Sequence, residues 1–281
     1  MAVQFASVVR TGTSSEDIEV QPSDPFLTRL ASIGTLTPDQ VRAATLMRSP
    51  PRRLRPRSQL GCSGNTSTAA YVIREGWAFA YTLLANGERR VLGFLLPGDI
   101  CCFGSLARAG VEVGIETITE TVITEISKAS VRGASRKWPE IYELFLRLQS
   151  GMLSALVGQL IDLGRRDSHA RVAGLLLKLE RRLLPIGEAG PDGYACPISQ
   201  YLIADALGLT AIHVNRVLRV LREEGVVTLR KNRVTFHDRA RLVEIAGYDD
   251  SDADDTAQVV VMNHGRGESR APGHGRPRIA L

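Results

Sequence analysis

The chain has 281 residues, of which 44% are hydrophobic and 23% are charged, and its formal net charge is +5. This length allows two domains with their own cores, and the apolar content is ordinary for a globular protein. No continuous apolar run approaches the length of a transmembrane segment, and the N-terminus lacks a signal-peptide pattern. We therefore expect a cytoplasmic protein with no membrane contact.

The positive charge is unevenly distributed along the chain. Residues 166–248 carry 13 Lys and Arg against 9 Asp and Glu, a surplus of 4, whereas residues 61–135 carry 6 against 7. A basic surplus in one part of a chain is the pattern expected where phosphate is bound. A solvated charged surface is the alternative.

Only two short helices are predicted in the first 70 residues. Residues 1–24, rich in Ser, Thr and Glu, predict a disordered start. Two short helices are predicted to begin at Pro25 and Pro38. Residues 49–57 contain three prolines and four arginines, which favour an extended connection over a helix.

Residues 71–126 contain segments in which apolar and polar side chains alternate, which predicts β-strands. Gly76, Asn86-Gly87 and Pro97-Gly98-Asp99 are expected to form turns between them. Many short strands with such turns are typical of a jelly-roll-like barrel. The Glu and Thr residues of 116–125 are expected to form the solvent face of one strand.

Cys101 and Cys102 are adjacent and form a candidate redox site, acting through thiol modification or through a partner thiol such as Cys62. A direct bond between neighbouring cysteines closes a strained ring, which disfavours that version. The alternative is that both are ordinary small core residues.

Residues 139–163 predict a long helix with a continuous apolar stripe. The residues of this stripe are Ile141, Leu144, Phe145, Leu148, Met152, Leu156, Leu160 and Leu163. The stripe must be covered, either by the barrel of the same chain or by a second helix in a coiled coil. A further helix is predicted from Asp167-Ser168 to Leu183, followed by a Gly/Pro-rich loop at residues 184–196.

The stretch from Ser199 to Phe236 predicts a winged helix-turn-helix. Ser199 can cap a first helix, Gly208 allows a tight left-handed turn because it lacks Cβ, and Thr210 can cap a second helix. In the second helix, apolar residues recur at helical spacing and predict one buried stripe, namely Val214, Val217, Leu218 and Leu221.

The opposite face of this second helix is predicted to read DNA, because the major groove admits one α-helix. The predicted contact residues are Ile212, His213, Asn215, Arg216 and Arg219. Arg216 is expected to bind O6 and N7 of guanine, while its neighbours tune the adjacent bases. Arg219 is better placed to bind phosphate.

Two short runs at residues 226–229 and 233–236 predict the strands of a wing, and the turn between them is basic. The predicted backbone contacts of this wing are Arg230, Lys231 and Arg233. The alternative for the whole stretch is an ordinary helical hairpin with a solvated charged face.

The segment ADALGLTAIHVNRVLRVLREEGVV resembles the DNA-binding domain of the Crp/Fnr superfamily, the regulators related to the cyclic-AMP receptor protein. EGWAFAYTLLANGERRVLGFLLPGDI resembles the effector domain of the same family, and the resemblance covers residues 25–247. It implies an α+β fold with an N-terminal jelly-roll-like β-barrel, a long dimerisation helix and a C-terminal winged helix-turn-helix. The implied parts are residues 25–135, 136–165 and 166–248, with a disordered tail at 249–281.

The resemblance also implies the partners. A dimer formed through the long helix places two recognition helices about one DNA turn apart, so the target is expected to be a near-palindrome. The expected partners are double-stranded DNA, a second copy of the chain and RNA polymerase.

The effector pocket departs from the family pattern. In the cyclic-nucleotide-binding branch a Gly-Glu pair binds the ribose and an Arg-Ser pair binds the phosphate. The corresponding positions here hold Cys102-Phe103 and Val111-Glu112. A carboxylate repels the cyclic phosphate and the guanidinium donor is missing, so cyclic AMP is disfavoured.

Two other cofactors are also disfavoured. An iron–sulfur cluster of the family type needs three cysteines clustered near the N-terminus, but the four cysteines are Cys62, Cys101, Cys102 and Cys196. Haem with a histidine ligand is disfavoured because His169 is the first histidine. No metal site and no other cofactor are predicted.

The favoured function is therefore a sequence-specific DNA-binding regulator. The alternative is a ligand- or redox-responsive signalling module whose helix-turn-helix mediates protein contacts. No enzyme is predicted, since the chain lacks P-loop, G-x-S-x-G and H-E-x-x-H motifs and no catalytic residue is assigned.

Overall fold

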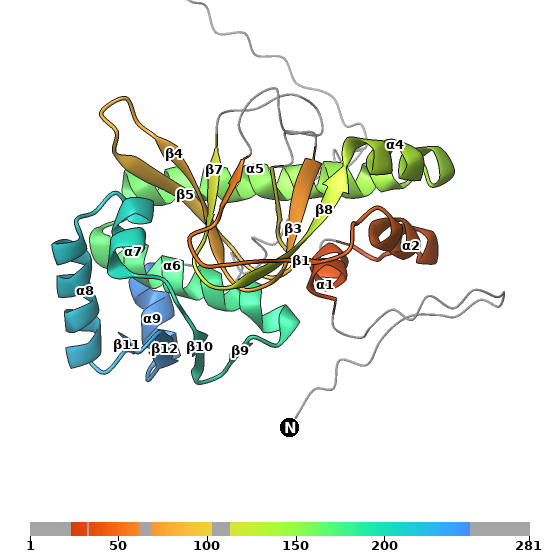
Figure 1. The fold of residues 1–281 in the computed structure, drawn as a ribbon. Helices are drawn as coiled ribbons and strands as arrows, with labels where there is room; N and C mark the ends of the chain where they lie inside the picture. Colours follow the sequence, from red (N-terminus) through yellow and green to blue (C-terminus); the bar gives the residue numbers. More distant parts are fainter. Residues whose placement is uncertain (1–23, 33, 62–68, 103–112, 248–281) are drawn as a thin grey trace, which may run out of the picture.

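The computed structural model describes residues 24–32, 34–61, 69–102 and 113–247. The predicted α+β architecture is confirmed: an N-terminal β-roll, a long helix and a C-terminal helix-turn-helix follow one another (Figure 1). In Figure 1 the long helix passes behind the strands of the roll, and the helix-turn-helix lies at the opposite end from the N-terminal helices. Residues 1–23 and 249–281, where disorder is predicted, lie outside the described residues.

The roll consists of two four-stranded antiparallel sheets. The first has the order β1 (Arg52–Leu54), β8 (Thr121–Ser127), β3 (Ala69–Glu75) and β6 (Ile100–Cys101). The second has the order β2 (Gln59–Gly61), β7 (Gly114–Thr117), β4 (Ala78–Leu83) and β5 (Arg89–Leu95). The predicted turns are confirmed at Gly76 and Gly98, whose φ angles are 84° and 92°. A Cβ at Gly76 would lie 2.2 Å from the carbonyl oxygen of Glu120, so this turn requires glycine.

The prediction for residues 116–125 is wrong in two respects. The segment belongs to two strands, β7 and β8, and three of its threonines are buried: Thr117, Thr121 and Thr124. Thr117 tolerates burial because its hydroxyl donates to the carbonyl of Arg55 at 2.7 Å and accepts from the amide of Ser58 at 2.9 Å. Alternation alone does not reveal that polar side chains satisfied in this way face the core.

Four helices pack around the roll at its N-terminal side: α1 (Pro25–Ser32), α2 (Pro38–Leu46), α4 (Lys128–Lys137) and the start of α5 (Ile141–Arg165). Both predicted short helices are confirmed, and Thr37 with Gln40 forms a capping box at α2. Helix α4 is not among the predicted elements. Together these helices bury an apolar cluster that includes Phe26, Leu30 and Trp138.

Helix α5 has two apolar faces where the sequence predicted one stripe. Ile141, Leu144, Phe145 and Leu148 are buried against the same chain. The second face is exposed and its members recur at alternating spacings of three and four residues. These are Leu146, Leu153, Leu156, Leu160 and, half-buried at its end, Leu163, with the polar Gln149 at one position of the repeat. This spacing is that of a coiled-coil seam.

Helix α5 is also long and apolar enough to span a membrane by length and composition alone, which the sequence reading did not anticipate. It has 25 residues, with a mean hydropathy of 1.3 and 17% burial in the best window. Its first turns are buried in the roll's own core, and its later turns expose the 3-4 repeat together with the apolar side chains of Met152, Val157 and Ile161. A 3-4 repeat is the pattern that a second helix covers in a coiled coil.

The C-terminal part begins with α6 (Ser168–Leu183) and η2 (Leu184–Ile186). It continues with β9 (Ala189–Gly190), β10 (Gly193–Ala195), α7 (Gln200–Leu207), α8 (Ala211–Glu223), β11 (Val227–Arg230), β12 (Arg233–Phe236) and α9 (Arg239–Ala246). The sheet order is β11-β12-β10-β9. The predicted loop at residues 184–196 is therefore wrong in part, because β10 pairs with β12 and widens the wing.

One apolar cluster joins the roll to the C-terminal part. From the roll it includes Trp77, Phe79, Val91, Phe94 and Leu96. From the C-terminal part it includes buried residues of α6, α7, α8 and the wing, among them Leu176, Ile203 and Val217. The two parts therefore share a core.

Polar contacts cross the same boundary. Arg182 of α6 donates to the carbonyl of Phe94 at 3.0 Å and to the carboxylate of Asp99. Arg89 of β5 lies 3.3 Å from the carboxylate of Asp205 in α7. The helix-turn-helix is thus held to the roll by ion pairs as well as by apolar contact.

Candidate nucleic-acid interface

The helix-turn-helix has the caps and turn that the sequence predicts. The Ser199 hydroxyl accepts from the amide of Leu202 at 3.3 Å, and the Thr210 hydroxyl accepts from the amide of His213 at 3.2 Å. Gly208 ends α7 in the left-handed conformation, with φ 64°. The predicted stripe of α8, from Val214 to Leu221, is buried. These contacts fix α8 against α7 and leave its other face free of the core.

The outward face of α8 is formed by exposed residues, namely Ile212, Asn215, Arg216 and Arg219. Ile212 is 83% exposed, so its side chain takes no part in the core. Arg219 lies 3.9 Å from Glu223, which is a weak exposed ion pair. The structure thus brings four of the five predicted α8 contacts onto one face.

His213 is directed elsewhere. Its ring nitrogen Nε2 is 2.9 Å from the hydroxyl oxygen of Ser168, at the start of α6. This hydrogen bond joins α8 to α6 and occupies one nitrogen of the imidazole. A role for His213 in tuning base contacts stays a prediction, and a structural role is the one that its contacts support.

The wing is a tight hairpin with a basic tip. Arg230 pairs with Arg233 across β11 and β12, and the two residues between them, Lys231 and Asn232, have φ angles of 49° and 57°. This is the left-handed geometry of a two-residue hairpin turn. The side chains of Arg230, Lys231 and Arg233 are exposed. The three predicted wing residues therefore lie together at the hairpin tip.

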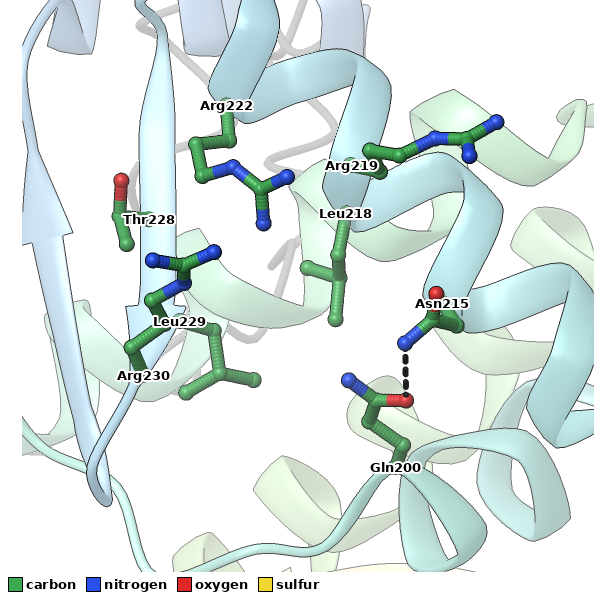
Figure 2. A pocket seen from close by; sticks show the side chains of 8 residues that line it. All are labelled: Gln200, Asn215, Leu218, Arg219, Arg222, Thr228, Leu229 and Arg230. Carbon is green, nitrogen blue, oxygen red and sulfur yellow. Dashed lines mark hydrogen bonds between the residues drawn. The ribbon is translucent and has the colours of Figure 1, made fainter.

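A groove runs between α8 and the wing (Figure 2). Its lining residues are Gln200, Asn215, Leu218, Arg219, Arg222, Thr228, Leu229 and Arg230. The sequence reading missed Gln200, Arg222 and Thr228. The spacing of Asn215, Arg219 and Arg222, four and three residues apart, could have placed Arg222 on the same helical face. No local signal placed Gln200 there, because the close packing of α7 on α8 brings it to the groove.

The predicted redox cysteines differ in environment. Cys101 is a free thiol in the core of the roll, and burial, helped by the nearby charge of Asp99, raises its pKa to about 12. Cys102, with a φ of 56°, is disulfide-bonded. A redox role stays a prediction for Cys102, while Cys101 has the environment of a core residue.

Cys101 and Cys196 are expected to resist alkylation in the folded protein at neutral pH. Burial raises their pKa values to about 12 and about 11, so the reactive thiolate is scarce until the pH approaches those values. Mass spectrometry after iodoacetamide treatment, with and without urea, measures this. Labelling of Cys101 at equal rates in both conditions would contradict the assignment.

The aligned effector positions lie largely outside the described residues: of Cys102-Phe103 and Val111-Glu112, only Cys102 is described. Among the residues that the structure describes, no group of three or more His, Cys, Asp or Glu side chains is arranged to hold a metal ion.

Comparison with known proteins agrees with this geometry. The Crp-like helix-turn-helix domain family matches residues 170–245, and the cyclic nucleotide-binding domain family matches residues 51–137. The fumarate and nitrate reduction regulatory protein of Escherichia coli strain K12 is 23% identical over 186 residues, which cover 66% of this chain and 74% of the relative. The anaerobic regulatory protein of Pasteurella multocida is 24% identical over 66% of this chain and 67% of its own length.

Solved structures show the same fold. FixK2 from Bradyrhizobium japonicum superposes with a TM-score of 0.64 at 25% identity, covering 71% of this chain and 98% of that one. The c-di-GMP responsive global regulator CLP of Xanthomonas campestris superposes with a TM-score of 0.57 at 20% identity, covering 70% and 98%. With its β-roll, long helix and winged helix in this order, the chain belongs to the Crp/Fnr superfamily of transcription regulators.

Proposed function

We propose that the protein is a homodimer that binds a near-palindromic DNA site, with α8 of each copy in the major groove and the wing along the phosphate backbone. The observation that carries this proposal is the pairing of an exposed polar face on α8 with a basic hairpin tip beside it. The opposite face of α8 is buried, so the polar face is available to DNA. The protein acts by binding DNA and contacting RNA polymerase in the cytoplasm, without catalysis.

Each exposed side chain has a role in this proposal. Arg216 donates two hydrogen bonds to O6 and N7 of guanine, and Asn215 pairs with adenine. Ile212, with no polar group to satisfy, contacts a thymine methyl group. Arg219, Arg230, Lys231 and Arg233 bind phosphate and supply affinity that does not depend on sequence.

The exposed seam of α5 supports the dimer. Four leucines recur along it at heptad spacing and are more than half exposed to water in the single chain: Leu146, Leu153, Leu156 and Leu160. A matching helix from a second copy would cover them. Two recognition helices related by a twofold axis then meet two half-sites of a palindrome.

In-vitro selection from random duplex DNA tests the proposal. A palindrome enriched by the purified protein supports it. Enrichment of no sequence would contradict it and favour the alternative, a signalling module whose helix-turn-helix contacts protein.

Arg216→Ala is expected to weaken binding to the selected site by about 1–3 kcal/mol and to relax specificity at one base position per half-site. Lys231→Ala is the matched control. It is expected to weaken binding to all sequences alike and to lower the slope of log affinity against log salt by about 1. Titrations against a panel of single-base variants measure both. An unchanged base preference in Arg216→Ala would defeat the guanine assignment.

A further inference from the structure

The side-chain amide of Asn215 is held by a residue from another helix. Its nitrogen Nδ2 donates to Oε1 of Gln200 at 3.0 Å (Figure 2). Gln200 is the first residue of α7, directly after the Ser199 cap, and Asn215 lies in the second turn of α8. The contact therefore spans the helix-turn-helix and depends on the packing of α7 against α8.

Of the long polar side chains that the structure describes in this groove, Gln200 is the one that can hold the amide of Asn215 in this way. Arg219, Arg222 and Arg230 also line the groove, but guanidinium groups carry donors and no acceptor. They cannot accept a hydrogen from the amide of Asn215. The oxygen of Gln200 supplies that acceptor at hydrogen-bond distance.

In this orientation of the two amides, the bond sets which atoms Asn215 presents to a base. A side-chain amide has one acceptor oxygen and two donor hydrogens, and a rotation of about 180° exchanges their places. With one hydrogen bound to Gln200, the oxygen Oδ1 and the second hydrogen remain available to DNA. Adenine matches this set, because it offers the N6 amino donor and the N7 acceptor in the major groove. Guanine offers two acceptors there and no partner for Oδ1.

We propose that Gln200 is a positioning residue for base recognition, which holds the amide of Asn215 so that Oδ1 faces the base and selects adenine. This inference rests on the proposed function, since it requires α8 to lie in the major groove. It adds a specificity role to a residue of the first helix, which itself need not touch a base.

The test begins from the site enriched by the wild-type protein. Asn215→Ala first identifies the base position that Asn215 reads, as the position where the base preference is lost. The ratio of dissociation constants for duplexes with guanine and adenine at that position is then measured for Gln200→Ala. We expect this ratio to fall by roughly fivefold or more, a large part of the discrimination that one bidentate pair supplies.

Three further variants test whether Gln200 positions Asn215 or only contacts the phosphate backbone. Gln200→Glu keeps an acceptor for Asn215, so it should preserve the adenine preference while its negative charge weakens binding to every duplex. Gln200→Ala combined with Asn215→Ala should discriminate no less than Asn215→Ala alone, because the two residues act through one contact. Arg230→Ala, in the same groove, should weaken binding to all duplexes alike.

Two results would overturn the inference. If Gln200→Ala weakens all duplexes equally, Gln200 acts on the backbone and does not position Asn215. If Asn215→Ala changes no base preference, Asn215 does not recognise a base and Gln200 cannot act through it. In both cases the wild type still enriches a site, so the proposed function stands. Enrichment of no site by the wild type overturns the proposed function and this inference together.

Discussion

Leu156→Glu is expected to convert the dimer into monomers while leaving the fold of each chain intact. Leu156 lies in the middle of the exposed seam of α5 and is 52% exposed in the single chain, so a charged side chain there costs the monomer little. In the dimer the carboxylate would be buried against apolar side chains without a partner. Sedimentation equilibrium measures the change in mass, and circular dichroism checks the fold.

Loss of the dimer should also weaken DNA binding. A monomer contacts one half-site, so the gain from linking two recognition helices is lost, and affinity for the palindrome should fall by roughly 100-fold or more. Ala155→Glu is the matched control, because Ala155 is the exposed neighbour of Leu156 and lies outside the heptad seam. A dimer that persists in Leu156→Glu with unchanged DNA affinity would show that α5 is covered by something other than its copy.

Arg239→Ala is expected to destabilise the winged helix by about 3 kcal/mol, near the lower end of the cost of breaking a buried ion pair. The carboxylate of Glu180 in α6 is 2% exposed, and both its oxygens accept from Nε of Arg239, at 2.9 and 3.0 Å. Loss of the guanidinium leaves a buried charge without this partner. The lower end applies because Arg239 is itself 41% exposed, so water can reach the vacated site. Urea unfolding measures the change.

Arg241 offers a control on the same helix. It pairs with Glu244 at 2.7 Å, but both side chains are more than half exposed. Arg241→Ala should therefore change stability by no more than about 0.5 kcal/mol. Equal effects of the two substitutions would mean that Glu180 does not depend on Arg239. Replacing Glu180 and Arg239 together by apolar residues of similar volume should recover most of the loss.

The helix-turn-helix could be predicted from the sequence because its determinants are local. Ser199, Gly208 and Thr210 act within four residues of their own positions, through a cap or a left-handed turn. The wing turn at Lys231 and Asn232 is also local. The periodic spacing of apolar residues predicts which side of α8 is buried, and the opposite side is then the exposed one.

Several features that the sequence does not predict, or predicts wrongly, depend on distant partners. The bond between Asn215 and Gln200 requires the packing of two helices, and the pair of Glu180 with Arg239 joins residues 59 positions apart. A helix with two apolar faces, such as α5, looks like one stripe when only its own residues are read. The burial of Thr117 likewise follows from acceptors and donors supplied by another segment.

The core shared by the roll and the winged helix has a consequence for the DNA that the protein accepts. Trp77 and Phe94 of the roll belong to the same apolar cluster as Leu176 and Val217 of the winged helix. Turning α8 relative to the roll would expose these side chains to water, which is unfavourable. In a dimer held by α5, the shared core would therefore fix the distance between the two recognition helices already in the free protein. Inserting or removing a base pair between the half-sites must then be absorbed by bending or twisting of the duplex.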